Sequence, residues 1–227
     1  MTERSDRLNR QKMLASRRLQ SLPWIGRGFS LLSNRLFARH FVPDLVKLHD
    51  VLEDTEMSGR YWVWAGMLLG WAREGDLLAH DRDADFALLP GDLAKLLSAV
   101  PALRQAGFQP MLQYRNNNGQ VTELTFRRRN AMFEFFVFEP VDGMLRSYVY
   151  GWSPDHLVEI ESLVPDQELV PFDFLGRTWL RHADFERELE CLYGDWRTPK
   201  RDWDYLEDDE SAIASRPWTN PDASWPT

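Results

Sequence analysis

The chain has 227 residues and a mass of 26.6 kDa, a length typical of one domain with a flank rather than two full domains. Its 44% hydrophobic and 27% charged residues exclude wholesale disorder and collagen-like structure. The longest uncharged apolar run, Tyr61–Ala72, is 12 residues long, whereas a helix needs ~20 to span a bilayer. With one cysteine, Cys191, and no secretory signal pattern, we expect no intrachain disulfide and a cytoplasmic location.

The net charge of −8 is unevenly distributed. Residues 1–40 carry nine Lys or Arg against two acids, so the remaining residues carry a net charge of −15. Because nucleic-acid binding depends on clustered cations, we expect no nucleic-acid partner for this acidic body. The basic residues of 1–40 are interleaved with apolar ones, which indicates either a helix packed on the domain or a peripheral contact with an anionic membrane.

Taken in chain order, the periodicity predicts three regions: a basic amphipathic segment over 1–40, a folded domain over 41–205, and an acidic tail with Pro and Trp over 206–227. Asp92 is expected to cap the helix over residues 93–107. We expect Pro154, Pro165 and Pro171 to mark loops, and Trp203, Trp218 and Trp225 to anchor the tail. Expected helices cover residues 45–52, 67–74, 93–107 and 184–193, and expected strands cover 61–64, 83–89, 108–114, 120–126 and 132–138. These elements predict an α/β (α+β) fold, a mixed sheet with flanking helices.

Three aspartates lead into the second predicted strand. Side chains alternate across a strand, so Asp81, Asp83 and Asp85 should share one face while Ala84 and Phe86 take the other. Carboxylates so close repel one another unless a divalent cation lies between them, and Mg²⁺ binds one or two carboxylates together with phosphate oxygens. An exposed acidic turn before an edge strand is the alternative interpretation.

Two further features fit a phosphate and metal site. Gly66 follows a strand and begins a helix, whose free N–H groups and positive dipole end can cradle a phosphate. Glu134 lies in an apolar strand, where a carboxylate is costly unless it is paired, protonated or bound to metal. It could instead pair with Arg127, Arg128 or Arg129 across a hairpin.

These residues resemble a known family. The segment WAGMLLGWAREGDLLAHDRDAD at 64–85 is similar to the LicD/fukutin signature, in which G-(S/T)-L-L-G-x-x-R precedes a D-x-D-x-D strand. The segments FEFF at 133–136 and LECLYGDWRTP at 189–199 agree with later motifs of that family in the same order. The likeness covers about residues 45–205.

The resemblance implies a nucleotidyltransferase-like fold and an enzyme that uses Mg²⁺ or Mn²⁺. Such an enzyme transfers a phosphate-linked alcohol, of the phosphocholine or ribitol-phosphate type, from a CDP-activated donor to a glycan or cell-surface polymer. By the matching positions, Asp83, Asp85 and Glu134 would be the catalytic, metal-binding acids, with Asp81 beside them. The donor would be met by a set of four residues: Gly66, Met67, Arg73 and His80.

Several positions depart from the family pattern. Met67 stands where Ser, Thr or Gly is usual, His80 replaces Trp, Glu134 replaces Asp, and the pair Arg181-His182 replaces Val-Pro. These departures leave the identity of the activated donor open. Two rival functions are a metal-dependent glycosyltransferase that uses a nucleotide sugar, and a non-catalytic binding module of the same fold.

Overall fold

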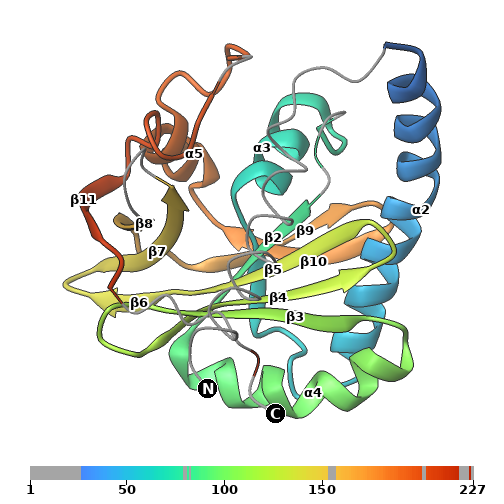
Figure 1. Cartoon of the computed structure of the whole chain (residues 1–227), viewed down its shortest axis with the longest axis horizontal. Coiled ribbons are helices and arrows are strands. Elements are labelled where there is room, and N and C mark those ends of the chain that lie inside the picture. Colours follow the sequence, from blue (N-terminus) through green and yellow to red (C-terminus); the bar gives the residue numbers. More distant parts are fainter. Residues whose placement is uncertain are drawn as a thin grey trace.

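The computed structural model describes residues 27–78, 81, 83–152, 157–200, 203–219 and 225. Within these ranges the chain forms four α-helices and eleven strands, arranged in sheets of five, four and two strands (Figure 1). This mixed architecture confirms the predicted α/β (α+β) class. Among the described residues, no helix is long and apolar enough to cross a membrane.

The five-stranded sheet has the order β1-β2-β5-β4-β3 and contains every strand that was predicted from the sequence. Strands β2 and β5 are parallel, and the other neighbours are antiparallel, so the sheet is mixed as expected. The strands are β1 (Tyr61–Val63), β2 (Asp83–Leu88), β3 (Gln109–Arg115), β4 (Val121–Arg128) and β5 (Ala131–Val137).

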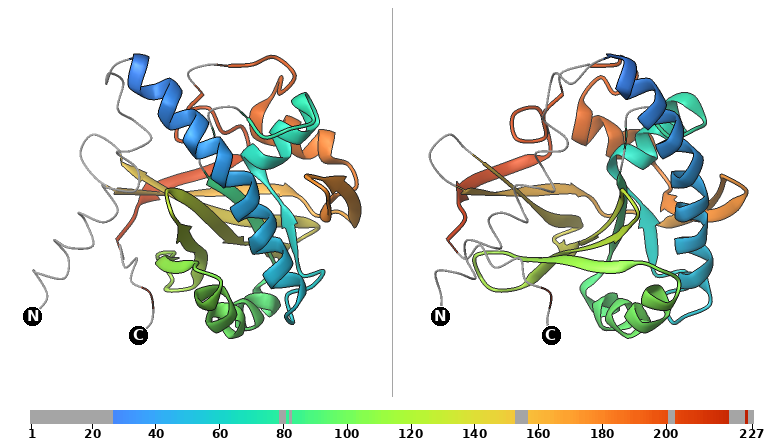
Figure 2. Two further views of the ribbon diagram at one scale, coloured as in Figure 1. Left: turned by 90° about the vertical axis from the view of Figure 1, so that its right-hand side faces the viewer. Right: turned by 45° about the vertical axis from the view of Figure 1, so that its right-hand side comes forward.

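One face of this sheet carries the main apolar core. Phe86 of β2 and Phe135 of β5 are fully buried, and their rings stack with centroids 5.0 Å apart. Helices α2 (Arg27–Glu53), α3 (Ala65–Glu74) and α4 (Leu93–Gln105) contribute apolar side chains to this core. Their ribbons lie beside the sheet in Figure 2. Burial of these rings under helices fixes which side of β2 turns inward, and therefore which side is left for the aspartates.

A second sheet, in the order β11-β8-β7-β6, packs against the end of the opposite face. Its strands are β6 (Glu139–Val141), β7 (Met144–Trp152), β8 (Leu157–Pro165) and β11 (Ala212–Pro217), and a separate ribbon joins β9 (Leu169–Phe174) to β10 (Arg177–His182). One of the loops expected at prolines is wrong, since Pro171 lies inside β9. Pro165 ends β8 directly before a loop, as expected, and Pro154 lies outside the described residues. Strand β9 pairs only with β10, and an edge position tolerates a residue without an N–H.

The helix ends agree with the sequence in one case and differ in another. In α5 (Phe185–Tyr193), the Asp184 carboxylate accepts a hydrogen bond from the Arg187 N–H, and Gly194 ends the helix with φ of 60°. The Asp92 carboxylate does not cap α4. It pairs with Lys95 at 2.6 Å instead. A 3-10 turn, η1 (Pro90–Asp92), leads directly into the helix at this point.

The two flanks of the domain are defined to different extents. Residues 1–26 of the basic segment lie outside the described residues, and α2 then runs without a break from Arg27 through Pro43 to Glu53. In the tail, β11 pairs with β8, so this stretch belongs to the second sheet. Trp218 is 4% exposed and its indole N–H donates to the Arg115 carbonyl, as expected for an anchor.

Candidate active site

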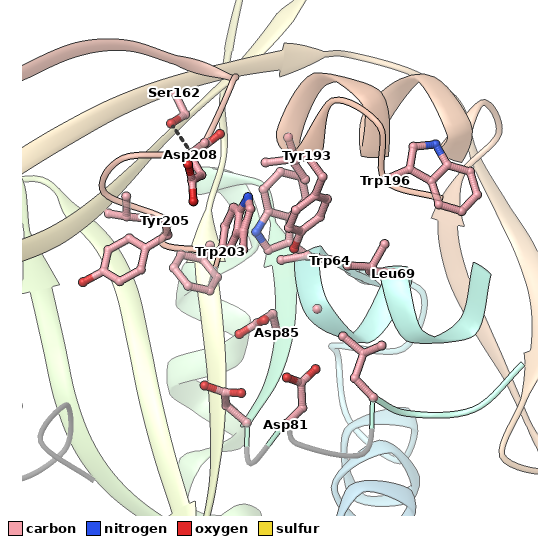
Figure 3. Close-up of a pocket in the computed structure, with 18 of the residues that line it drawn as sticks. Trp64, Leu69, Asp81, Asp85, Ser162, Tyr193, Trp196, Trp203, Tyr205 and Asp208 are labelled. Atoms are coloured by element: carbon pink, nitrogen blue, oxygen red, sulfur yellow. Dashed lines mark hydrogen bonds between the residues drawn. The ribbon is translucent and has the colours of Figure 1, made fainter. Parts of the chain in front are cut away.

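A cavity of about 1630 Å³ opens on the face of the five-stranded sheet opposite the main core. Its floor comes from β2, β5 and β4, one side from the start of α3, and the other side from the end of α5 and the chain that follows it (Figure 3). Carboxylates from both sides line it, while Arg73 and Lys200 are its cationic lining residues among those described. An anionic ligand would therefore enter a strongly negative space.

The predicted acids lie on the floor of this cavity. Asp83 and Asp85 project from alternate positions of β2, and Glu134 is the direct neighbour of Asp85 across the parallel β2–β5 pair. Asp81 lines the cavity just before β2. All four acids that the sequence singled out therefore line one cavity. Strand alternation places Asp83 and Asp85 on one face, and the β2–β5 register adds Glu134 to it.

Two of the three alternative partners of Glu134 are engaged elsewhere. Arg128 and Arg129 both pair with Asp44 of α2, at 2.9 and 3.0 Å, and so brace that helix. Arg127 is in register with Met132, two residues along β4 from the position that faces Glu134, and therefore lies on the same face of the sheet as Glu134. A pairing of Glu134 with Arg127 stays open.

Burial and the neighbouring carboxylates raise the pKa values of Asp85 and Asp81. Burial, then the charges of Asp83, Asp81 and Glu123, raise the pKa of Asp85 well above its usual range, against one hydrogen bond from the Gly66 N–H. Burial, then the charges of Asp83 and Glu74, raise the pKa of Asp81 to about 7. Each ionised carboxylate therefore costs free energy that a bound cation would offset.

The carboxylate oxygens on this face are suitable ligands for a hard divalent cation. Oxygen ligands on a self-repelling face suit Mg²⁺ or Mn²⁺. In the described part of the chain, however, no three His, Cys, Asp or Glu side chains are grouped closely enough to hold an ion. A shared ion at Asp83, Asp85 and Glu134 consequently stays a prediction that requires side-chain rotation when the ion binds.

The turn between β1 and α3 positions Asp85. The Trp64 N–H donates to the Asp85 carbonyl at 3.0 Å, and the next residue, Ala65, has a left-handed φ of 47°. At Gly66 a Cβ atom would lie 2.9 Å from Oδ2 of Asp81, so a larger residue there would require the Asp81 carboxylate to shift. The Gly66 N–H, expected to face phosphate, instead orients the Asp85 carboxylate.

The other predicted donor-binding residues are separated by the structure. Arg73, near the end of α3, lines the cavity, where its charge can meet a phosphate. The Met67 side chain is 1% exposed and packs in the main core, so only its backbone could serve a ligand. His80 lies outside the described residues.

Comparison with known protein families bears on this arrangement. The model of the LicD/FKTN/FKRP nucleotidyltransferase domain matches residues 58–179, more than half of the chain. The chain belongs to this LicD/FKTN/FKRP family. Members of the family are generally transferases, and the matched range contains the β1–α3 turn, Arg73 and every acid of the cavity floor. No curated protein matches the chain.

One acid on the cavity floor was not predicted from the sequence. Glu123 of β4 lines the cavity, is 2% exposed, and accepts a hydrogen bond from the Thr125 hydroxyl at 3.1 Å. It lies opposite Phe136 in the β4–β5 pair, two residues along the strand from the position facing Glu134. The alternation in Thr-Glu-Leu-Thr-Phe over 122–126 could have shown that an acid takes the same face as Thr125.

The other side of the cavity lies beyond the matched family domain. We call this side the C-terminal wall: residues 192–212 where they line the cavity, including Tyr193, Trp203, Tyr205 and Asp208 (Figure 3). Asp209 accepts hydrogen bonds from Ser162 and Ser211, and its burial raises its pKa. The sequence singled out the motif over 189–199 and Trp203, but not their place beside the acids, because the wall is held by pairing of β11 with β8, about fifty residues earlier.

Contacts within the C-terminal wall, and between the wall and strand β7, fix its position. The Trp203 ring lies 4.8 Å from the Tyr193 ring, centroid to centroid. The Tyr205 hydroxyl donates to the Tyr150 carbonyl at 3.1 Å. Burial, then the charges of Asp85 and Asp81, hold the pKa of the Tyr193 phenol well above its usual range, which places that side chain within electrostatic reach of the floor.

Proposed function

We propose that this protein is a transferase that uses Mg²⁺, or Mn²⁺ in its place. It moves a phosphate-linked alcohol, of the phosphocholine or ribitol-phosphate type, from a CDP-activated donor to a hydroxyl of a glycan or cell-surface polymer. The observation that carries the proposal is the alignment of Asp83, Asp85 and Glu134 on the floor of a large acidic cavity. Membership of the LicD/FKTN/FKRP family supports the general reaction class.

Electrostatics explains why a cation is part of the proposal. A nucleoside diphosphate is anionic, and without a cation it would be repelled by the carboxylates of the floor and of the C-terminal wall. Asp83, Asp85 and Glu134 would hold the ion. When bound, Mg²⁺ would neutralise the diphosphate and stabilise the charge that develops on the leaving nucleotide.

The reaction balances as follows. The acceptor hydroxyl oxygen forms a bond to the phosphorus that carries the alcohol, and the bond from that phosphorus to the bridging oxygen breaks. CMP leaves with the electron pair, and the hydroxyl proton passes to a carboxylate of the floor. Glu134 and Glu123 are the floor carboxylates from β5 and β4. Arg73, at the edge of the cavity, would bind phosphate oxygens.

Product identity tests this function. The protein would be incubated with CDP-choline, CDP-ribitol, a UDP-sugar or a GDP-sugar and a glycan fraction, with Mg²⁺ or with EDTA, and the released nucleotides separated. We expect Mg²⁺-dependent CMP release. Release of UDP or GDP would identify the rival glycosyltransferase, and Mg²⁺-dependent binding of a CDP compound without release would identify a non-catalytic module.

We further propose that the protein works in the cytoplasm, with peripheral membrane contact through residues 1–40. The support is their sequence alone, since each cation near an anionic surface is worth about 1 kcal/mol. Sedimentation with anionic vesicles should be weaker for a chain that lacks residues 1–26, and unchanged with neutral vesicles. Equal sedimentation of both chains with anionic vesicles would contradict the contact.

A further inference from the structure

Tyr193 is placed over the acidic floor by a well-fixed helix. It is the last residue of α5 and lines the cavity, with Trp203 beside it and Asp85 and Asp81 across from it (Figure 3). In the middle of α5 the fully buried Glu188 carboxylate lies 2.8 Å from the His182 ring nitrogen, within hydrogen-bond distance. This contact ties the helix to strand β10.

The chain just after Tyr193 is also fixed. Gly194 has φ of 60°, and a Cβ there would overlap the Glu210 carboxylate. The Glu210 N–H donates to the Leu192 carbonyl at 3.2 Å. The chain is therefore held by specific contacts on both sides of Tyr193.

The hydroxyl of Tyr193 is the part that packing does not explain. A phenylalanine would fill the same space beside Trp203. Three other donors on the cavity lining are engaged: the Tyr205 hydroxyl with the Tyr150 carbonyl, the Ser162 hydroxyl with Asp209, and the Lys200 ammonium with Asp208 at 2.6 Å. In the described part of the chain, the indole N–H groups of Trp196 and Trp203 make no hydrogen bond. Within the described ranges, the Tyr193 hydroxyl makes no hydrogen bond to another residue.

An anion in this cavity needs donors that add no negative charge. A phenol has an ordinary pKa near ~10, so at neutral pH it is an uncharged O–H donor. It can stand beside carboxylates without the repulsion that another acid would add, and a hydrogen bond from it to a charged oxygen is among the stronger kinds. Arg73 would approach the same ligand from α3, on the opposite side of the cavity.

We propose that the Tyr193 hydroxyl donates a hydrogen bond to a phosphate oxygen of the nucleoside diphosphate donor. This inference rests on the proposed function and names the residue outside the matched family domain that meets the donor phosphates. It makes α5 part of the donor site, with Trp203 holding the ring and the His182–Glu188 pair holding the helix. Tyr193 then acts by contact with the substrate, and Glu188 acts only through the helix.

The test compares Tyr193→Phe with Tyr148→Phe, a matched loss of one hydroxyl from a buried tyrosine outside the cavity lining. Titration calorimetry with Mg²⁺ would measure binding of CDP and of cytidine, beside the melting temperature of each variant. We expect Tyr193→Phe to weaken CDP binding about 10- to 100-fold, which is the range for a hydrogen bond to a charged group. Cytidine binding and the melting temperature should stay unchanged, and Tyr148→Phe should bind CDP like the wild type.

The other outcomes separate this proposal from the proposed function. Equal CDP binding by Tyr193→Phe and the wild type would overturn the phosphate contact alone. An equal loss of cytidine and CDP binding would assign Tyr193 to the nucleoside and also overturn it. If the wild type binds no CDP with Mg²⁺, the proposed function fails, and the phosphate contact fails with it.

Discussion

The two faces of the five-stranded sheet differ although they are built from alternate residues of the same strands. On one face Phe86 and Phe135 are fully buried under helices; on the other Asp85 and Glu134 face a cavity. The apolar face stabilises the fold, whereas burial and repulsion raise the pKa of Asp85 and so cost stability when it is ionised. A sheet face that costs stability in the absence of a ligand is a candidate for binding one.

The largest effects should come from neighbouring residues of β2 with opposite roles. Asp85→Asn should lower CMP release by orders of magnitude and leave the melting temperature unchanged or higher, because it removes a charge and keeps the shape. Phe86→Ala should cost about 3–5 kcal/mol of unfolding free energy through the cavity it leaves. Activity assays and urea unfolding of both variants measure the contrast. Normal turnover by Asp85→Asn would contradict the proposed difference between the two faces of the sheet.

A graded loss across the strands would sharpen the comparison. Glu134→Gln should lower turnover more than Glu123→Gln, because Glu134 is in register with Asp85 and Glu123 lies one strand further away. We expect roughly 100-fold and 10-fold losses, in the range for groups that transfer protons or hold charge. Steady-state kinetics at several Mg²⁺ concentrations would rank them. The reverse order would make Glu123, not Glu134, the third acid.

Loosening the C-terminal wall should affect the acidic face and spare the apolar one. Arg216 of β11 donates to Glu159 at 2.9 Å and to Glu161 at 2.7 Å, and Glu159 is 1% exposed. Arg216→Ala leaves these carboxylates without that cation, at a cost of about 1–3 kcal/mol because Arg216 itself is partly exposed. Hydrogen exchange should increase in β11 and β8, with α2 and α4 unchanged. Equal loosening of the helices would contradict a local role.

The smallest effect concerns pH. Asp81 has its pKa raised to about 7, so the folded state holds this proton more tightly than the unfolded chain. The wild type therefore loses stability as pH rises from about 4, the pKa of an unfolded aspartate, through 7. Asp81→Asn removes this loss, and its gain in melting temperature should grow over that window by the equivalent of about 1 kcal/mol or more. A gain that is independent of pH would show that Asp81 is not protonated there.

The sequence predicted features whose signals are local. Alternation over Asp81–Leu89 placed the aspartates on one face, and the spacing before Gly194 placed α5. Glu134 was found as an acid in an apolar strand, but its register with Asp85 depends on a parallel pairing across about fifty residues. Asp92 was wrong as a cap because Lys95, one turn later, competes for its carboxylate.

The parts that escaped prediction depend on distant pairing. The C-terminal wall forms only when β11 meets β8, and Pro217 in that strand favours a loop when it is considered alone. Glu123 is hidden in a strand whose other residues suggest ordinary packing. The role of Gly66 in orienting Asp85 needed the turn geometry, since the sequence showed only a glycine before a helix.

The central claim is that the acidic face holds a divalent cation beneath the donor diphosphate. Calorimetric titration of CDP into the wild type, Asp83→Asn and Asp85→Asn, each with Mg²⁺ and with EDTA, tests it most directly. We expect CDP binding by the wild type only with Mg²⁺, and none by either variant, while all three proteins stay folded. Binding of CDP in EDTA, or Mg²⁺-dependent binding that survives in both variants, would contradict the account.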